Sequence, residues 1–375
     1  MIHDNHAHVV IVGGGAVGSS IAYHLAVRPD FRGRITVVER DPTYARASSA
    51  LSASSIRQQF STPVNIRLSQ FGIQFLRELG LELGLREGGY LFLASAEGAE
   101  TLRANHALQR SMGADLAFMQ PSALIECFPW LNADGIAAGV LGLSGEGWFD
   151  GPALMQAFRR KARELGATYL TGEAIKVRPG RVWLTDRAID ADVVVIAAGA
   201  WTGRLLDLPI RPRRRMVFVV ACPTVLPGCP LLIDPSGVWM RPEGSRFLCG
   251  RSPAGDEPDP DEPPLAVDEA LFMESVWPVL AHRIPAMETL KLTSSWAGYY
   301  EMNLFDHNGA VGPLPGLDGV LVAAGFSGHG IQHSPGVGRG IAELIVDGRY
   351  TTLDLSPLDP GRIARGERLV ERNVV

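Results

Sequence analysis

The stretch Val9-Val10-Ile11-Val12-Gly13-Gly14-Gly15-Ala16-Val17-Gly18 decides the fold of this chain. Its first four residues form an apolar run that is stopped by glycines, which is typical of a buried parallel strand. Val17, Ile21 and Leu25 then follow at helical spacing, and Ile35–Glu39 is expected to be a second strand. The order of strand, glycine-rich turn, helix and strand predicts one βαβ unit.

The glycines of this stretch fit the pattern G-x-G-x-x-G directly between the strand and the helix. In that context glycine lets the backbone approach a pyrophosphate, and the helix N-terminus offers unpaired N–H groups. Glu39 ends the second strand, where a carboxylate suits the ribose hydroxyls of an adenosine. The segment therefore predicts a dinucleotide site rather than a merely structural turn.

FAD and NAD both use this fingerprint, so other segments must distinguish them. The serine-rich segment Ser48–Ser55 offers hydroxyls to phosphate, although an ordinary loop is the alternative interpretation. Small residues end a second buried strand at Ala197-Ala198-Gly199-Ala200-Trp201, and Gly325-Phe326-Ser327-Gly328-His329-Gly330 precedes the last helix. A lone NAD site needs one glycine loop, whereas the long FAD molecule can use both. FAD is favoured, and an NAD-only dehydrogenase is the weaker alternative.

The whole-chain composition fits an ordinary globular protein of about two domains. Of the 375 residues, 46% are hydrophobic and 20% are charged, and the net charge is −5. This charge favours neither nucleic acid nor an anionic membrane as a partner. The basic run Arg211–Arg215 is interpreted as a solvated face rather than a phosphate site. The four cysteines form no CxxC pair, so neither disulfides, zinc nor another metal is expected.

The N-terminus reaches a strand at once and carries no recognisable signal peptide, and no apolar run approaches the ~18 residues of a membrane span. A cytoplasmic location is therefore expected. Other helices are expected from Pro63, with Thr62 as N-cap, and after Asp150, and the last one ends at Gly348. The segment Ser252–Pro264 is acidic and proline-rich and is expected to be an exposed loop.

The α/β segments occur near the start, the middle and the end of the chain, separated by stretches that alternate like antiparallel strands. The predicted fold class is α/β, or α+β overall: a glutathione-reductase-like Rossmann FAD domain with an inserted, mainly antiparallel sheet. The FAD domain is expected to comprise residues 1–86, 145–211 and 305–375. The substrate domain is expected to comprise residues 87–144 and 212–304.

These motifs together resemble the D-amino-acid oxidase/sarcosine oxidase (DAO) superfamily over essentially the full chain. GGGAVG, Glu39, the AAGAW segment and GFSGHGIQHSPGVG lie where that superfamily has its FAD contacts. IRQQFS (56–61), GEGWFD (145–150), GYYE (298–301) and DLSP (354–357) are similar to its branch of mitochondrial FAD-dependent oxidoreductase domain-containing proteins and their bacterial relatives. A member of that branch is linked to respiratory complex I assembly.

The resemblance implies an FAD site in which one set of residues contacts the cofactor. The expected cofactor-binding residues are Gly13, Gly15, Ala16, Val17, Gly18, Glu39, Arg40, Ser48, Ser49, Ser52, Ala53, Ser54, Val177, Ala198, Gly199, Trp201, Gly325, Gly328, His329, Gly330, Ile331 and Gln332. The last helix would direct its N-terminus, near Gly330, at the flavin pyrimidine edge. Sarcosine oxidases carry a covalent flavin cysteine in the segment that matches Ala297–Asp306, where this chain has none. The FAD is therefore expected to be non-covalent.

The implied reaction passes a hydride from the carbon that bears nitrogen to flavin N5, and the imine then hydrolyses. Gln332 replaces the lysine with which sarcosine oxidases bind the substrate carboxylate, so an arginine should take that role. The candidates are Arg57, Arg241 and Arg251, and Tyr299 and Tyr300 are candidates for lining the pocket. For each arginine a structural role is the alternative, and for the tyrosines core packing is.

The expected activity is that of an FAD-dependent amine or amino-acid oxidase or dehydrogenase. Its substrate would be a secondary amine or N-substituted amino acid such as sarcosine, dimethylglycine or iminodiacetate. Oxygen or an electron carrier would accept the electrons, and rapid reaction with oxygen is in doubt because the oxygen-activating lysine of sarcosine oxidases is missing near Phe247–Gly250. The alternative is a flavoprotein that acts mainly as an assembly or partner subunit of a larger complex. The oligomeric state is left open.

Overall fold

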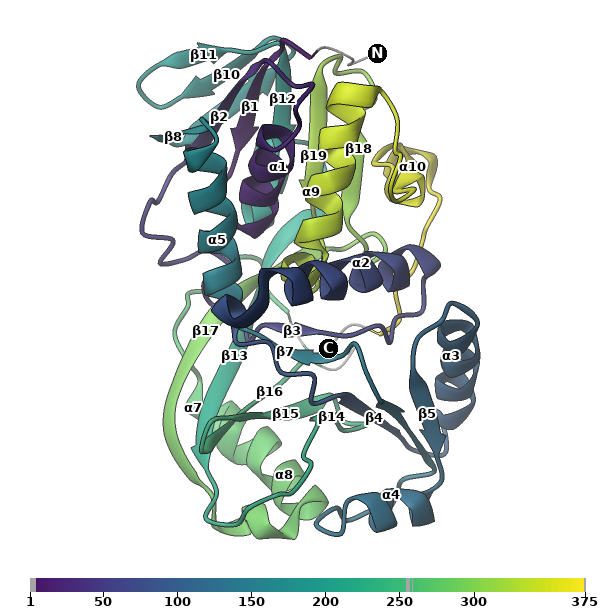
Figure 1. Cartoon of the computed structure of the whole chain (residues 1–375). Helices are drawn as coiled ribbons and strands as arrows, with labels where there is room; N and C mark the ends of the chain where they lie inside the picture. The colour runs from purple at the N-terminus through teal and green to yellow at the C-terminus, as the bar shows by residue number, and fades with distance from the viewer. Residues whose placement is uncertain (1–4, 254–256, 258, 374–375) are drawn as a thin grey trace.

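Strand β1 (His8–Val12) lies near the middle of a six-stranded sheet in the computed structural model of this chain, which describes residues 5–253, 257 and 259–373 (Figure 1). The order across the sheet is β18-β19-β12-β1-β2-β8. All neighbours are parallel except β18, which runs antiparallel to β19. The other strands of this sheet are β2 (Arg34–Glu39), β8 (Thr168–Thr171), β12 (Val193–Ile196), β18 (Ala310–Pro313) and β19 (Val320–Ala324).

Both faces of this sheet are covered, which explains why its central strands are apolar at every position. Val9 and Ile11 of β1 pack with helices on one face, and Val10 and Val12 pack with a three-stranded meander on the other. The helices are α1 (Ala16–Ala26), α2 (Pro63–Leu79), α5 (Gly151–Glu164) and α9 (Gly330–Asp347). The meander strands are β9 (Ala174–Arg178), β10 (Arg181–Leu184) and β11 (Ala188–Asp190). This region is the expected Rossmann unit.

A second sheet of eight mostly antiparallel strands has the order β17-β13-β16-β15-β14-β4-β6-β5 (Figure 1). Its strands are β4 (Tyr90–Ala94), β5 (Leu116–Met119), β6 (Ala138–Gly142), β13 (Ile210–Ala221), β14 (Leu231–Ile233), β15 (Val238–Glu243), β16 (Arg246–Arg251) and β17 (Lys291–Asn303). The associated helices are α3 (Ala99–Ser111), α4 (Pro121–Cys127), α7 (Glu269–Leu271) and α8 (Trp277–Arg283). The small sheet of β3 (Ser55–Ile56) and β7 (Gly147–Trp148) lies between the two large ones.

The two-residue period of a strand divides this second sheet into a helix side and a cavity side. Leu232, Met240 and Phe218 belong to clusters that include the helices α4, α7 and α8 or the segments beside them. Their neighbours Ile233 and Trp239 point the other way and line a large cavity between the two sheets. The eight-stranded sheet is thus the roof of a site whose floor is the carboxyl edge of the parallel sheet.

The fold class expected from the sequence is confirmed, and most of its local elements are too. Asp150 caps α5 by accepting a hydrogen bond from the Ala153 N–H at 2.8 Å, and α9 ends at a left-handed Gly348. Thr62 is the N-cap residue of α2, as expected, but its hydroxyl donates to Glu371 at 2.8 Å instead of accepting a hydrogen bond from a helix N–H. The strands of each sheet fall within the predicted domain ranges, except that β13 begins at Ile210, just ahead of the predicted boundary. The boundaries themselves stay a prediction.

The basic run is a correction, because Arg213 and Arg215 are not on a solvated face. Their side chains are 9% and 12% exposed, and both form ion pairs with Asp259. The described part of the loop 252–264 is therefore held to β13 by charge pairs, so it is not simply exposed. Residues 254–256 and 258 of that prediction lie outside the described residues. No helix of the described ranges combines the length and apolar character needed to cross a membrane.

The buried ion pair between Arg362 of α10 (Gly361–Arg365) and Asp306 yields a prediction about stability. The two side chains are 4% and 0% exposed and meet at 2.8 Å. Arg362→Met leaves a buried carboxylate unpaired, so it should lower the free energy of unfolding by about 3–5 kcal/mol in a urea titration. Arg365→Met is the matched control, because its pair with Asp359 is 51% and 37% exposed. The control should lose less than about 1 kcal/mol, and equal losses would contradict the prediction.

Candidate cofactor and substrate site

A cavity of about 660 Å³ runs between the two sheets. Its floor is formed where β2, β1, β12 and β19 end, and these strands are neighbours in that order. Glu39 lies at one end, and Tyr90, Leu231 and Ile233 of the roof sheet lie at the other. Parallel strands place their carboxyl ends at one edge of the sheet, so the loops that follow them gather into one elongated site.

The first glycine loop is shaped by close backbone contacts. Gly13 has φ +103°, and a β-carbon there would lie 2.2 Å from the carbonyl oxygen of Ala197. The Glu39 carboxylate accepts hydrogen bonds from the Gly14 N–H at 2.8 Å and the Asp41 N–H at 2.9 Å. Glu39 is thereby fixed beside the glycines, in the position that an adenosine ribose requires.

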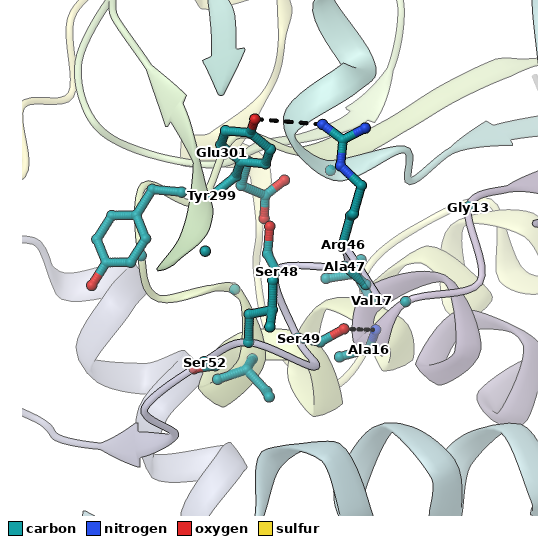
Figure 2. Close-up of a pocket in the computed structure, with 18 of the residues that line it drawn as sticks. Gly13, Ala16, Val17, Arg46, Ala47, Ser48, Ser49, Ser52, Tyr299 and Glu301 are labelled. Carbon is teal, nitrogen blue, oxygen red and sulfur yellow. Dashed lines mark hydrogen bonds between the residues drawn. The ribbon is translucent and has the colours of Figure 1, made fainter. Parts of the chain in front are cut away.

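The serine-rich segment lies against the start of α1. Ser49 Oγ accepts a hydrogen bond from the Ala16 N–H at 3.4 Å, as Figure 2 shows, while Ser52 Oγ accepts one from the Ser54 N–H at 3.0 Å. Ser48, Ser49 and Ser52 line the cavity together with Ala53 and Ser54. Their small side chains leave room for a ligand to pass along the backbone.

The other two predicted segments border the same cavity. The Arg40 guanidinium lies 3.7 Å above the Trp201 ring, which closes the cavity beside Ala198 and Gly199. At the start of α9, a β-carbon on Gly328 would lie 2.5 Å from the ring of Tyr300. A side chain at Gly328 would therefore fill the cavity wall, which confines this loop to glycine. Gly330, Ile331 and Gln332 also line the cavity.

The site fits a long dinucleotide such as FAD. It offers a carboxylate at the ribose end, two glycine loops and the N-terminus of the long helix α9, which favours negative charge. Tyr44 lines the cavity, and its buried hydroxyl has no hydrogen-bond partner among the described residues. The same holds for Nε2 of His329. A bound cofactor with hydroxyl and carbonyl groups would satisfy both atoms.

Glu301 of β17 is a buried carboxylate in the middle of this cavity (Figure 2). Its Oε2 accepts the Gly325 N–H at 3.0 Å, and its Oε1 lies 2.8 Å from the position of a β-carbon on Gly330. Burial raises the pKa of Glu301 to about 7, and no described arginine or lysine forms an ion pair with it. The carboxylate therefore faces the half of the cavity beyond the first glycine loop, between the ends of β12 and β19.

Arg57 lines the opposite, roofed end of the cavity. Its side chain is 5% exposed, donates from Nη1 to the Gln59 carbonyl at 2.9 Å and donates from Nη2 to the Asn373 carbonyl. Its backbone N–H donates to Oε1 of Gln332 at 2.8 Å. Burial lowers the pKa of Arg57, yet a guanidinium stays charged in proteins. Among the described residues no carboxylate forms an ion pair with Arg57, and the buried carboxylates of Glu371 and Glu146 favour its charge only from a distance.

Two buried carboxylates hold the loop that carries Arg57. Glu146 accepts hydrogen bonds from the N–H groups of Gln58 at 2.6 Å and Gln59 at 3.1 Å. Glu371, near the end of the chain, accepts from the N–H and hydroxyl of Ser61 at 2.8 and 2.6 Å. No local pattern predicts these contacts, because the partners are far apart in the chain.

Four predicted site residues do not line the cavity. The position of a β-carbon on Gly18 faces the Gly13 carbonyl at 1.9 Å, so Gly18 serves the packing of α1 on the loop. Val177 lies in β9 and packs in the core behind the sheet. Gly325 faces Ile210, and only its N–H reaches Glu301. Arg241 points toward the cavity side, but its guanidinium is already bound. Nε and Nη2 donate to the Ala53 carbonyl at 3.1 and 2.7 Å, and Nη1 pairs with the Glu243 carboxylate.

The other predicted residues border the cavity, including Arg251, Tyr299 and Tyr300, and their roles stay predictions. The lining residues that were not predicted include four polar ones, Arg46, Tyr90, Arg215 and Glu301. Arg46 extends toward the Tyr299 hydroxyl, at 3.5 Å (Figure 2). A glutamate inside the apolar strand segment GYYEMN was the one available signal, since a carboxylate in a buried strand needs a reason. The non-covalent nature of the cofactor also stays a prediction.

Comparison with known proteins agrees with this geometry. The model of the FAD dependent oxidoreductase family, DAO, matches residues 8–344. FAD-dependent oxidoreductase domain-containing protein 1 of Xenopus laevis is 44% identical, over 98% of this chain and 85% of that protein. Glycine oxidase of Geobacillus kaustophilus is 29% identical over 93% of this chain and 95% of that enzyme.

Solved structures share the whole architecture. The crystal structure of L-proline dehydrogenase from P. horikoshii is 28% identical, with a TM-score of 0.85 over 97% of this chain and 99% of that one. The structure of the Geobacillus glycine oxidase is 26% identical, with a TM-score of 0.81 over 94% and 98% of the two chains. The similarity extends over both sheets and therefore over the whole cavity between them.

Glu39 gives a first prediction for cofactor binding. Glu39→Ala should weaken FAD binding by about 1–3 kcal/mol, or roughly 5- to 150-fold in Kd, because it removes a charged acceptor. Fluorescence titration of the FAD-free protein with FAD measures this change. Glu173→Ala is the matched control, since Glu173 lines the same end of the cavity but is 51% exposed. Unchanged affinity for FAD in Glu39→Ala would refute the assignment.

Because burial raises the pKa of Glu301 to about 7, we expect FAD binding to depend on pH. The FAD phosphates and the loss of water should raise the pKa of Glu301 above its value of about 7 in the free protein. FAD affinity should then be full below about pH 7 and fall as pH rises through that value, by up to about tenfold per unit. Glu301→Gln should remove this slope.

The groups around Glu301 do not produce the same slope. Burial holds the pKa of His329 at about 3, so this imidazole stays neutral, and Arg46 stays charged. Burial raises the pKa of Tyr300, so this phenol also stays neutral. Glu146→Gln is the matched control, because burial raises the pKa of Glu146 to about 7 as well but Glu146 lies outside the cavity lining. A wild-type affinity that is flat between about pH 6 and 9 would exclude the linkage.

Proposed function

This chain belongs to the DAO family of FAD-dependent oxidoreductases, and from that membership we propose that it oxidises the carbon–nitrogen bond of a small secondary amine or N-substituted amino acid. Glycine oxidase, L-proline dehydrogenase and dimethylglycine dehydrogenase, three of the proteins to which this chain is similar, are named for amino-acid substrates. The bound FAD supplies a two-electron acceptor for a hydride from the substrate carbon.

The observation that carries the proposal is the buried guanidinium of Arg57. A buried charge without a partner is costly, and an anionic ligand removes that cost. Arg57 already uses Nη1 and Nη2 for one backbone carbonyl each, which fixes the plane of its fork. A guanidinium has five N–H donors, so others remain for a carboxylate. We therefore assign Arg57 the substrate carboxylate, ahead of Arg251 and Arg241.

The residues around Arg57 form the end of the cavity at which we place the substrate. Gln332 uses Oε1 to accept the Arg57 N–H, so its amide NH₂ is the group left to donate to a substrate. Burial raises the pKa of Tyr90 to about 12, and its hydroxyl donates to Ser55. Tyr90 and Tyr300 thus present neutral rings to the substrate and exclude water from it. A deprotonated amine is the form that can lose a hydride.

The electron acceptor and the cellular setting complete the proposal. Oxygen or an electron carrier takes the electrons from the reduced cofactor. Lys is absent from Phe247–Gly250, and we propose slow reaction with oxygen on that basis. The cytoplasmic location expected from the sequence remains a prediction.

Arg57→Met tests the assignment directly. It should raise KM for sarcosine and L-proline about 10- to 100-fold, because a charged hydrogen-bonded pair contributes roughly 1.5–3 kcal/mol. KM for dimethylamine and pyrrolidine, which lack the carboxylate, should change little. Anaerobic bleaching of the flavin absorbance measures both.

Arg241→Met is the matched control, since Arg241 is equally buried but holds the Ala53 carbonyl. It should affect acids and amines alike. Equal effects of Arg57→Met on both substrate types would show that Arg57 does not bind the substrate carboxylate, and the same result for Arg241→Met and Arg251→Met would show that the substrate carries no carboxylate. If no amine or amino acid bleaches the wild-type flavin, the alternative of an assembly or partner subunit takes precedence.

A further inference from the structure

Three arginines line the roofed end of the cavity, and they differ in what neutralises them. These are Arg57, Arg215 and Arg251. Arg215 pairs with Asp259 and Arg251 with Glu257, whereas Arg57 has no carboxylate partner among the described residues. Among the described residues, ion pairs with Asp259 and Glu257 neutralise Arg215 and Arg251, and the Arg57 guanidinium is the cation left to pair with a ligand carboxylate.

The pair of Arg215 and Asp259 is bidentate. Nη1 and Nη2 of Arg215 lie 3.2 and 3.1 Å from the two carboxylate oxygens, and Nη1 also donates to the Arg214 carbonyl at 2.8 Å. The guanidinium lies 5.3 Å from the centre of the Tyr300 ring, which also lines the cavity. Arg215 is thus directed at the cavity, and Asp259 occupies the edge that a ligand carboxylate would use.

The rest of the roof at this end is apolar. Met216, Val217, Leu231, Ile233 and Trp239 line it. A ligand carboxylate placed among these side chains and away from Arg57 would lose its water without gaining a cation, and Asp259 would repel it. An apolar group in the same place would gain from burial.

We propose that this enzyme selects a substrate with one carboxylate and an apolar body, and that Asp259 is the specificity-determining residue that excludes a second carboxylate by neutralising Arg215. The inference rests on the proposed function, because it assumes that the substrate occupies this end of the cavity. It narrows the substrates expected from the sequence: N-alkyl or cyclic amino acids of the sarcosine and proline type fit, whereas a diacid such as iminodiacetate does not.

The test measures binding and needs no turnover. Valerate and glutarate have the same five-carbon chain and differ in a terminal methyl or carboxylate group. Each is titrated into the FAD-loaded protein at about pH 8, and the change in flavin absorbance gives Kd. Wild type should bind valerate at least about tenfold more tightly than glutarate. Equal or tighter binding of glutarate by the wild type would overturn the proposal, whatever the variants do.

Asp259→Asn should release Arg215 and reduce or reverse the preference by at least about tenfold, with glutarate gaining affinity. Asp259→Glu, which keeps the charge, should preserve it. Asp261→Asn is the matched control, because Asp261 lies in the same loop and pairs with Arg213, which does not line the cavity and which keeps its second partner, Asp259, in this variant. A folded, FAD-loaded Asp259→Asn protein with the wild-type preference would contradict the role of Asp259.

Failure of the proposed function and failure of the selection by Asp259 give different results. If valerate binds in preference to glutarate but no amine or amino acid reduces the flavin, the charge selection holds and the proposed reaction is wrong. If secondary amino acids reduce the flavin and glutarate binds as well as valerate, the reaction holds and the selection by Asp259 is wrong.

Discussion

A β-carbon at Gly13 would lie 2.2 Å from the Ala197 carbonyl oxygen, so the chain can bring the ends of β1 and β12 together only if this residue has no side chain. The resulting turn directs the Gly14 N–H at Glu39 and starts α1 beside the serine-rich segment. Gly18 extends the same constraint, because it lets α1 pack on the Gly13 carbonyl. The position of the whole cofactor end of the cavity follows from this contact between two backbones.

The substrate end depends on buried charges rather than on backbone geometry. Arg57 is supported by a loop whose N–H groups are held by Glu146 and Glu371, which are 0% and 1% exposed. Neither carboxylate forms an ion pair with Arg57, although both favour its charge from a distance, and their hydrogen bonds to the loop fix its position. Buried polar networks of this kind are rigid because each broken bond leaves a desolvated group unpaired. A rigid arginine is what selective recognition of a carboxylate requires.

Much of the fold was predictable because its signals are local. Buried parallel strands such as β1 and β19 read as continuous apolar runs, and glycines mark the turns at their ends. The same locality explains why the glycine, serine and AAGAW segments were recognised as cofactor segments, and the family and its FAD were confirmed. Arg241, a candidate for the substrate carboxylate, does not line the cavity, whereas Arg215 lines it and was not predicted. Both are arginines on roof strands with suitable spacing, and nothing in their local sequence tells which acceptor each fork reaches.

The sequence by itself determined that this chain forms a dinucleotide-binding βαβ unit, belongs to a family of FAD enzymes and carries arginines suited to a carboxylate. Those conclusions follow from residue types whose conformational and chemical preferences act over a few neighbouring positions. The acceptor that each of these arginines reaches among the described residues depends on folding. Asp259 neutralises Arg215, and the Ala53 carbonyl accepts the hydrogen bonds of Arg241. The Asn373 carbonyl, near the other end of the chain, orients Arg57. The free charge of a site is a property of all the groups packed around it, and folding brings those groups together from distant positions.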